Sequence, residues 1–332
     1  MNYPRIAIVG ATGVVGQMFL TVLEERKIPF SSLVLFASKN SAGQTIQYQG
    51  KTYTILELNE TNVTAHPVDF ALFSAGGDVS KIYAPLFVKI GAKVIDNSSY
   101  FRMHPDYPLV VPVVNPEDLQ GHLSIIANPN CSTVQAVVAL KPLHERYTLK
   151  RIVISTYQAV SGAGSLGIHD LETRADQDHL KKFPYPIHQN LIPLIDVFLD
   201  NGYTKEEMKM VHEMRKILHL PNLAITATAV RVPVLNAHSE SINVTFEQPF
   251  LLEDVRHILA TSPGVTLYDD PSSFMYPMPS LVSGQDQVYV GRLRVDESLP
   301  NTLNMFVVGD NIRKGSATNA VQILERLLTK LS

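Results

Sequence analysis

Short apolar runs separated by amphipathic segments dominate the first 127 residues. Residues 5–9 form such a run, which leads through a glycine-rich turn into an amphipathic segment over 17–26. A second apolar-faced segment, over 79–90, stops at Gly91, a residue type that commonly ends helices. The remaining runs predict buried strands at 33–37, 69–73, 93–96, 109–114 and 123–127. Strands and helices that alternate in this way predict a parallel sheet with helical crossovers.

The pattern changes after residue 131. A polar helix is predicted over 166–180, followed by a proline-broken loop over 181–199. Thr204 and Glu207 have the spacing of a capping box, which predicts a helix from there to about residue 218. Further strands are predicted at 151–158, 224–234, 239–246, 288–296 and 304–308, and a last helix at 311–331. We expect 224–234 and 239–246 to form a strand pair around a turn at 236–238.

The predicted fold class is α/β, with a Rossmann-type parallel sheet domain and a second α+β domain. A length of 332 residues suits two domains of ordinary size. We place the first domain in residues 1–130 plus 310–332 and the second in residues 131–309. No internal repeat or low-complexity segment interrupts either one.

Composition narrows the functional class. Apolar residues make up 45% and charged residues 18% of the chain, which fits a globular enzyme and argues against extended disorder. A net charge of −3 offers no basic field to nucleic acid. No apolar run approaches the roughly 20 residues of a membrane span, and the N-terminus lacks the features of a secretory signal. One cysteine excludes an intrachain disulfide framework and fits a reducing compartment, so we expect a cytoplasmic protein.

The turn after the first strand has the chemistry of a dinucleotide site. Gly10, Gly13 and Gly16 follow a strand and open a helix, which is the context that a nucleotide fingerprint requires. Gly10 permits the tight turn, Gly13 lets backbone N–H groups approach a pyrophosphate, and Gly16 lets the helix pack closely on the strand. The spacing is G-x-x-G-x-x-G, a variant of the more common G-x-G-x-x-G.

The residues after the second strand favour NADP over NAD. An NAD site usually has an Asp or Glu there to bind the ribose 2′-OH, whereas residues 38–41 are Ser-Lys-Asn-Ser. The alternative is an ordinary polar loop.

Cys131 is the candidate nucleophile. It follows an Asn-Pro-Asn turn at the predicted start of a helix, where unpaired N–H groups and the helix dipole favour an anion and lower the pKa of a thiol. The alternative is a buried structural cysteine.

Candidate partners for the thiol lie later in the chain. Gln158 could hydrogen-bond a reacting carbonyl, His238 could act as acid or base, and Arg231 could clamp a carboxylate. Glu206 and Lys209 share a helix face, which taken alone indicates a surface pair. A surface ion pair is likewise the alternative for Arg231. No cluster has metal-ligand spacing.

Taken together, these motifs resemble the aspartate-semialdehyde dehydrogenase family over the whole chain. The matching segments stand in the family's order at 10–16, 73–77, 128–133, 157–164, 231–234 and 309–315. The resemblance implies reversible, NADP-linked reductive dephosphorylation of L-aspartyl 4-phosphate to L-aspartate 4-semialdehyde, a branch-point step towards diaminopimelate and lysine, methionine and threonine. It also implies a homodimer, a dinucleotide-binding first domain, and a second domain for catalysis and dimerisation.

The resemblance also implies roles for individual residues. The acyl-thioester cysteine maps onto Cys131, the acid/base histidine onto His238, and the substrate-orienting glutamine onto Gln158. Arg231 corresponds to the arginine for the substrate carboxylate and Glu206 to the glutamate for its amine. Phosphate-binding groups map onto Arg102, Asn130 and Lys209. The implied cofactor contacts are Gly10, Thr12, Gly13, Val14, Val15, Ser38, Asn40, Ser41, Gly76, Ser161, Gly162 and Asn311.

The sequence departs from the family pattern at two positions, and two alternative functions remain. Asn40 stands where many members have an arginine for the 2′-phosphate, and Thr318 where many have an aromatic residue. N-acetyl-γ-glutamyl-phosphate reductases share the chemistry but lack the stretch at 158–164. A non-catalytic NADP-binding protein is the alternative from a different class, and would show no phosphate-dependent reduction of NADP.

Overall fold

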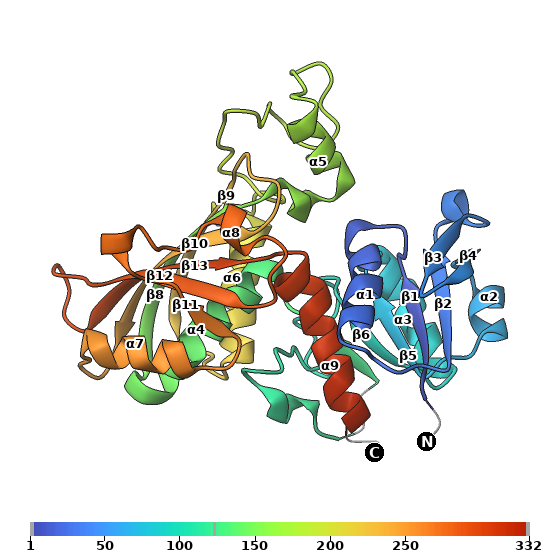
Figure 1. Cartoon of the computed structure of the whole chain (residues 1–332), viewed down its shortest axis with the longest axis horizontal. Helices are drawn as coiled ribbons and strands as arrows, with labels where there is room; N and C mark the ends of the chain where they lie inside the picture. Colours follow the sequence, from blue (N-terminus) through green and yellow to red (C-terminus); the bar gives the residue numbers. More distant parts are fainter. Residues whose placement is uncertain (1–2, 122–123, 330–332) are drawn as a thin grey trace. The chain divides into compact units, whose positions relative to one another are not determined.

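A computed structural model describes residues 3–121 and 124–329. The chain forms two compact units, one made of residues 1–129 and 316–332 and the other of residues 130–315 (Figure 1). The boundaries expected from the sequence lay at 130/131 and 309/310. Each unit is built around its own sheet.

The first unit contains a seven-stranded sheet in the order β3-β4-β2-β1-β5-β6-β7. All neighbouring strands are parallel except β3 and β4, which form an antiparallel hairpin at one edge. The strands are β1 (Arg5–Val9), β2 (Ser32–Ala37), β3 (Thr45–Tyr48), β4 (Lys51–Glu57), β5 (Phe70–Phe73), β6 (Lys93–Asp96) and β7 (Ile125–Ala127). The predicted Rossmann-type sheet is thereby confirmed, although residue 123, where we expected its last strand to begin, lies outside the described residues.

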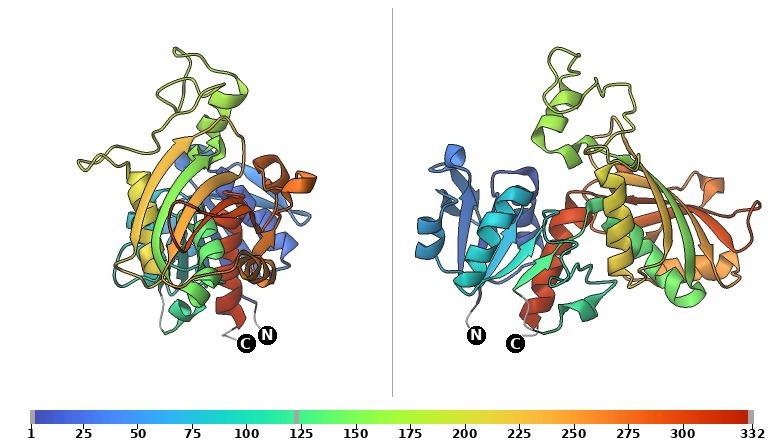
Figure 2. Two further views of the ribbon diagram at one scale, coloured as in Figure 1. Left: turned by 90° about the vertical axis from the view of Figure 1, so that its left-hand side faces the viewer. Right: turned by 180° about the vertical axis from the view of Figure 1, so that it is seen from behind.

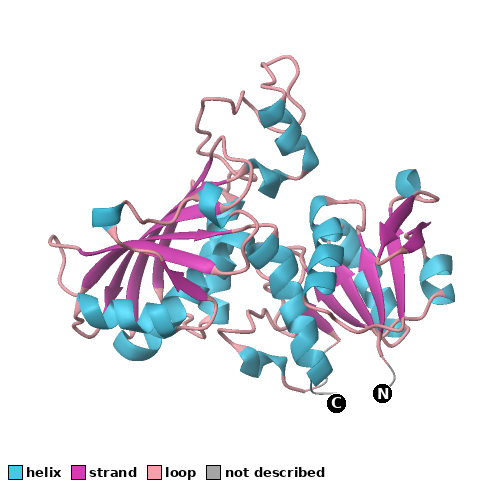
Figure 3. Cartoon of the chain, viewed as in Figure 1, coloured by secondary structure: helices cyan, strands magenta, loops and turns pink. Residues whose placement is uncertain are grey.

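Helices connect these strands and cover the sheet (Figure 3). They are α1 (Val14–Glu25), α2 (Glu60–Ala65), α3 (Gly77–Lys89) and α9 (Thr318–Thr329), with the short turns η1 (Lys39–Ser41) and η2 (Pro116–Leu119). Although α9 is distant in sequence, it packs on α1, and Arg26 forms a bidentate pair with Glu325 at 2.7 and 2.8 Å. The predicted last helix began at residue 311, whereas a π turn, η5 (Arg313–Ala317), precedes α9. Its predicted end at residue 331 lies outside the described residues.

The second unit contains a six-stranded mixed sheet in the order β11-β12-β13-β10-β8-β9. The strands are β8 (Leu149–Gln158), β9 (Ala224–Arg231), β10 (His238–Phe246), β11 (Val265–Leu267), β12 (Val288–Val295) and β13 (Thr302–Gly309). One face packs against α4 (Cys131–Tyr147), α6 (Lys205–Ile217) and α7 (Leu252–Thr261) (Figure 2). The short elements are α5 (Ser165–Glu172), α8 (Pro279–Val282), η3 (Val160–Ala163) and η4 (Pro271–Ser273). This confirms an α+β second domain.

The capping box is confirmed, but the expected strand pair is wrong. Thr204 and Glu207 exchange both capping hydrogen bonds, and α6 ends at Ile217. By contrast β9 and β10 are not neighbours, because β8 lies between them, parallel to β9 and antiparallel to β10. Parallel neighbours need a crossover, and α6 supplies it between β8 and β9.

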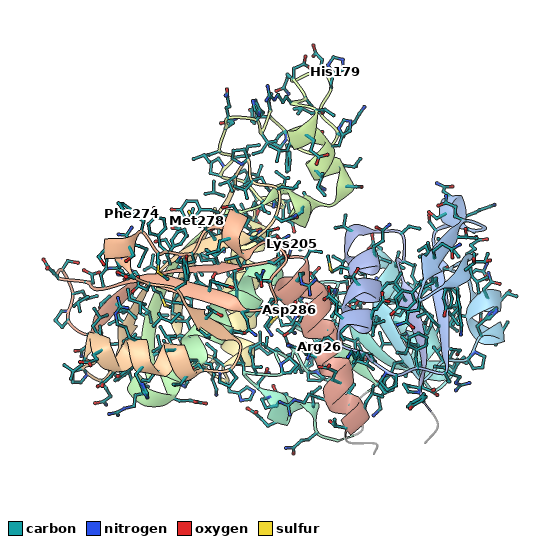
Figure 4. All side chains as sticks on the ribbon, in the orientation of Figure 1. Arg26, His179, Lys205, Phe274, Met278 and Asp286 are labelled. Atoms are coloured by element: carbon teal, nitrogen blue, oxygen red, sulfur yellow. The ribbon has the colours of Figure 1, made fainter. Side chains whose placement is uncertain are left out.

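The helix predicted over 166–180 ends at Glu172. Arg174 has a φ of 53°, a left-handed conformation that stops the helix. The buried carboxylate of Asp170 then accepts the backbone N–H groups of 181, 182 and 183 at 2.8–3.1 Å, which folds the chain back on α5. The loop over 173–203 projects from the second unit, with His179 near its tip (Figure 4).

Several elements have too weak a hydrophobic periodicity to be predicted from the sequence. The strands β3 and β4 bury only one side chain each, and α2, α7 and β11 are short elements with few buried residues. The apolar run at 109–114 forms only a bridge between Leu109 and Ala127. Among the described residues, no helix has the length and apolarity needed to cross a membrane.

Two glycines allow the turn between β1 and α1 to close. Gly10 has a φ of 88°, and a Cβ there would overlap the carbonyl of Ser74. A Cβ on Gly16 would overlap the carbonyl of Gly10, whereas one on Gly13 would make only an ordinary contact. The close approach of helix to strand therefore requires glycine at position 16.

We expect Gly16→Ala to destabilise the chain by about 1–3 kcal/mol, because the methyl group must displace backbone. Thermal and urea unfolding of the nucleotide-free protein measure this. Gly13→Ala is the matched control and should unfold close to wild type. Equal midpoints for Gly16→Ala and wild type would show that the turn relaxes without cost.

Candidate active site

The N-terminus of α4 carries Cys131. Asn130 is the N-cap, and its Oδ1 accepts the N–H groups of Ser132 and Thr133 at 3.0 and 3.4 Å. Such caps typically contribute about 1 kcal/mol to helix stability. Gly315 packs against this turn so closely that a Cβ there would lie 2.7 Å from the Cβ of Cys131. The predicted placement of the thiol at the first turn of a helix is confirmed, and it is partly accessible.

A buried carboxylate lies beside this turn. Glu206 on α6 accepts from the Nδ2 of Asn130 at 2.8 Å and from Gln158 at 3.2 Å. Lys209 donates to Glu206 at 3.1 Å and to Asp196 at 2.8 Å. Burial opposes the charged form of Glu206, but the charge of Lys209 and these hydrogen bonds hold the pKa of that carboxyl below its usual value. The pKa of Lys209 is raised: burial alone would lower it, and Glu206 and Asp196 outweigh burial.

Arg231 and His238 converge from neighbouring parts of the sheet. Arg231 ends β9, and one of its terminal nitrogens donates to the carbonyl of Ala159 at 2.6 Å. The Nδ1 of His238, at the start of β10, accepts the N–H of Ala159 at 3.0 Å. A Cβ on Gly162 would lie 3.2 Å from both side chains, so the glycine leaves room where the guanidinium and the imidazole end.

The imidazole of His238 is neutral. Complete burial, assisted by the charge of Arg231, lowers its pKa well below the usual value. Because Nδ1 accepts a hydrogen bond, the ring proton is assigned to Nε2. Nε2 has no hydrogen-bond partner among the described residues. The ring can therefore donate one hydrogen bond to a group placed beside it.

These contacts bring together Cys131, Gln158, Glu206, Arg231 and His238 within the second unit. The negative form of the thiol also acts on the pKa of Arg231, which burial lowers and the neighbouring anions, first Glu206 and then Cys131, raise. A nucleophile, a donor, a cation and a carboxylate thus surround one position. This set can bind a zwitterionic substrate and attack a carbonyl.

Arg102 belongs to the first unit and is buried. Its guanidinium donates to the carbonyls of Asn128 at 2.9 Å and Asn97 at 2.8 Å, next to the carboxyl ends of β7 and β6. Of the other two expected phosphate ligands, Asn130 caps α4 and Lys209 bridges two carboxylates. All three side chains are thus held in place by protein groups.

The first unit gathers most of the expected cofactor residues at the carboxyl ends of β1, β2 and β5, which are adjacent in the sheet. No side chain of the described residues caps the N-terminus of α1 or of α3, where Gly13 and Gly76 are the N-caps. Uncapped first-turn N–H groups at a helix N-terminus suit an anion such as a pyrophosphate. The residues at this edge are Gly10, Thr12, Gly13, Val14, Val15, Ser38, Asn40, Ser41 and Gly76.

The remaining three expected cofactor residues lie in the second unit. Asn311 accepts the N–H of Ala237 at 2.9 Å and donates to the hydroxyl of Ser161 at 3.0 Å. Gly162 follows Ser161 and faces Arg231 and His238. Asn311 and Ser161 therefore form one buried network.

Sequence reasoning missed three buried side chains around the thiol: Gln135, Glu213 and Glu240. Gln135 follows Cys131 by one helical turn and donates to the carbonyl of His238 at 3.2 Å. Glu240 lies two residues after His238 and therefore on the same face of β10. Periodicity relative to the predicted site residues is the signal that could have found them.

Glu240 is an uncompensated carboxyl in the core of the second unit. It is fully buried, and neither oxygen has a hydrogen-bond partner in the described part of the chain. Burial raises its pKa well above the usual value, and interaction with the Gln135 side chain acts in the opposite direction. Burial therefore favours the protonated form of this carboxyl.

Two family models match the chain. Residues 5–122 match the semialdehyde dehydrogenase NAD binding domain, and residues 140–314 match the semialdehyde dehydrogenase dimerisation domain. An aspartate-semialdehyde dehydrogenase of Aquifex aeolicus is 53% identical, with 99% of this chain and 98% of that protein aligned.

Solved structures give the same result. Aspartate semialdehyde dehydrogenase II from Vibrio cholerae, at 44% identity, has a TM-score of 0.93, with 99% of both chains covered, and has also been solved complexed with ASA. An aspartate semialdehyde dehydrogenase from Candida albicans, solved with NADP, is 26% identical with a TM-score of 0.78, again with 99% of both chains covered. The predicted family is thereby confirmed.

We expect Glu240→Gln to stabilise the chain increasingly as pH rises. The unfolded glutamate titrates near pH 4.3. Between that pH and its raised folded pKa, the folded chain binds more protons than the unfolded one, so wild-type stability falls with rising pH. The variant has no such group. Its thermal midpoint, relative to wild type, should climb from pH 5 to pH 8.

Glu247→Gln, at an exposed position just beyond the same strand, is the control for this experiment. Parallel midpoint curves for Glu240→Gln and wild type would mean that Glu240 is ionised in the folded chain.

Proposed function

The chain belongs to the aspartate-semialdehyde dehydrogenase family, and we propose that it catalyses the reversible, NADP-linked reductive dephosphorylation of L-aspartyl 4-phosphate to L-aspartate 4-semialdehyde. The observation that carries this proposal is the placement of Cys131 at a helix N-terminus beside Arg231, His238 and Glu206. The relatives named above are aspartate-semialdehyde dehydrogenases, which does not favour an N-acetyl-γ-glutamyl-phosphate reductase. Cys131 lies beside charged groups that suit a zwitterionic substrate, and this arrangement does not favour the alternative of a non-catalytic NADP-binding protein.

Two charged groups suit the two ends of the amino acid. Glu206 and Asp196 together carry one more negative charge than Lys209 offsets, which attracts the substrate ammonium. The guanidinium of Arg231 uses one terminal nitrogen on Ala159, and no other hydrogen bond engages it among the described residues. A fork held in this way suits a bidentate clamp on the α-carboxylate. Gln158 is held by Glu206 and orients the reacting acyl group.

Arg102, Lys209 and Asn130 are the proposed phosphate ligands. Arg102 and Lys209 are cations fixed by carbonyls and carboxylates, so they lose little side-chain entropy when phosphate binds. Asn130 contributes an amide next to the helix N-terminus, where an anion is favoured.

The covalent step proceeds on Cys131. Its thiolate attacks the acyl carbon, and the C–O bond to phosphate breaks with its electrons leaving on the phosphate. NADPH, when bound, supplies the hydride that the thioester carbon accepts. When the thioester carbon accepts the hydride, negative charge develops on the acyl oxygen, and the neutral ring of His238 stabilises it with a hydrogen bond from Nε2–H. Collapse of this thiohemiacetal anion re-forms the C=O bond and breaks the C–S bond, whose electrons leave on sulfur as the thiolate.

The nucleotide turn of the first unit supports NADP as the cofactor. The first-turn amides of α1, which no described side chain caps, suit the pyrophosphate, and residues 38–41 contain no carboxylate that would repel a 2′-phosphate. Ser38, Lys39 and Asn40 are exposed at the carboxyl end of β2, within reach of a ribose at this edge.

A homodimer is proposed through the outer face of the second sheet. The chain matches a dimerisation domain over residues 140–314. α4, α6 and α7 cover one face, whereas Tyr157 and Phe306 lie on the other, with Tyr157 36% exposed. A second copy would cover this face. A nucleophilic thiol also needs a reducing environment, which supports the cytoplasm.

Aspartate semialdehyde, phosphate and NADP test the proposal directly. Wild type should form NADPH only when phosphate is present. Cys131→Ala should lose turnover by about 10⁴-fold or more, because no covalent intermediate can form, while NADP binding persists. Turnover near the wild-type rate in this variant would remove Cys131 from the reaction, and phosphate-independent turnover would refute the acyl-phosphate step.

Asn40→Arg should widen the preference for NADP over NAD. A guanidinium adds a charged hydrogen bond to the 2′-phosphate, worth about 1.5–3 kcal/mol, or roughly tenfold or more in the ratio of kcat/KM. Gln47→Arg is the control, since it adds the same charge on the exposed edge strand β3. An unchanged ratio in Asn40→Arg would show that this loop does not contact the phosphate.

A further inference from the structure

The helix α6 carries two buried glutamates that each bind backbone N–H groups of other segments. The Oε2 of Glu213 accepts the N–H of Asn130 at 2.6 Å. Glu207 accepts the N–H groups of Ala229 at 2.9 Å and Thr204 at 2.7 Å. Of these two glutamates, only Glu213 reaches the turn that carries Cys131.

With the contact of Glu213, the backbone N–H and both side-chain polar atoms of Asn130 are hydrogen-bonded. The backbone N–H of Asn130 binds Glu213, its Oδ1 caps α4, and its Nδ2 binds Glu206. Glu213 is 1% exposed, and burying a carboxylate is costly unless hydrogen bonds and a favourable field offset the cost. The positive end of the α4 dipole supplies such a field. The buried carboxylate of Glu213 therefore binds the residue immediately before the thiol.

The same carboxylate changes the electrostatics around the thiol. From α6, Glu206 and Lys209 also face this turn, and Arg231 on β9 interacts with the charge of Cys131. His238 on β10 is neutral, and Lys314 is buried next to Gly315, which packs on Cys131. Within this set Glu213 is the anion bonded directly to the backbone beside the nucleophile.

We propose that Glu213 is a positioning residue for Cys131: its carboxylate fixes the backbone at the start of α4, and its charge restrains thiolate formation. The first part rests on the proposed function, because position matters only if the thiol reacts with the substrate. Two conservative variants separate the two effects. Glu213→Gln keeps an acceptor oxygen and loses the charge, whereas Glu213→Asp keeps the charge and draws the oxygen back from Asn130.

The charge is tested by alkylation. Cys131 is the only thiol, so the rate of iodoacetamide addition against pH reports its titration without interference. We expect Glu213→Gln to lower the midpoint by on the order of one pH unit, since removing a nearby negative charge favours the thiolate. Glu213→Asp should titrate near wild type. Glu207→Gln is the matched control, a buried glutamate of the same helix whose contacts lie elsewhere, and should leave the midpoint unchanged.

Position is tested by kinetics with aspartate semialdehyde, phosphate and NADP. Glu213→Asp should lose kcat by about 10²-fold, because a displaced nucleophile misses the reacting geometry, with a smaller change in KM. Glu213→Gln should retain most of kcat. A wild-type kcat in Glu213→Asp would overturn the positioning role.

An unshifted midpoint in Glu213→Gln, or an equal shift in Glu207→Gln, would overturn the electrostatic role. Failure of wild type to turn over the semialdehyde would refute the proposed function instead, and the alkylation experiment would still decide the charge effect.

Discussion

The hydrogen bonds of Asn130 hold the start of α4, and the chemistry of the second unit depends on them. One side chain caps the helix that carries Cys131 and also binds Glu206, while its backbone binds Glu213. A helix dipole can favour an anion only where the first turn is fixed, because the effect falls off within a turn. Asn130 therefore links the thiol to the α6 carboxylates through contacts of 2.6–3.0 Å rather than through a flexible loop.

The buried charges around this turn compensate one another only in part. Glu206 keeps a lowered pKa because Lys209, Asn130 and Gln158 outweigh the cost of burial. No comparable hydrogen-bond set supports His238 or Glu240 in the described part of the chain, so burial favours the neutral form of both side chains. Their burial removes water from the site and leaves one directed donor, the Nε2–H of His238. A site arranged in this way stabilises negative charge on a substrate oxygen without first reorganising solvent.

The sequence predicted those features that local chemistry determines. The glycine turn, the capping box at Thr204 and the thiol at a helix start each depend on a few consecutive residues. The order of β8, β9 and β10 does not, because it depends on a crossover that spans more than fifty residues. The early end of α5 at Glu172 has a similar origin, since Asp170 binds backbone eleven to thirteen residues later. Periodicity along α6 could have pointed to Glu213, but not to its partner Asn130, which is 83 residues distant.

Glycines determine the shape of the site as much as its polar side chains do. A Cβ on Gly315 would press on Cys131, one on Gly309 would meet Gln135, and one on Gly162 would meet Arg231 and His238. In each case a backbone segment packs against the side chain of a proposed catalytic residue or of its neighbour. Such packing limits the rotamers of those side chains more tightly than hydrogen bonds alone, because close-packed atoms leave no room for displacement. Gly162, Gly309 and Gly315 thus have a steric reason in the second unit, separate from the nucleotide turn in the first.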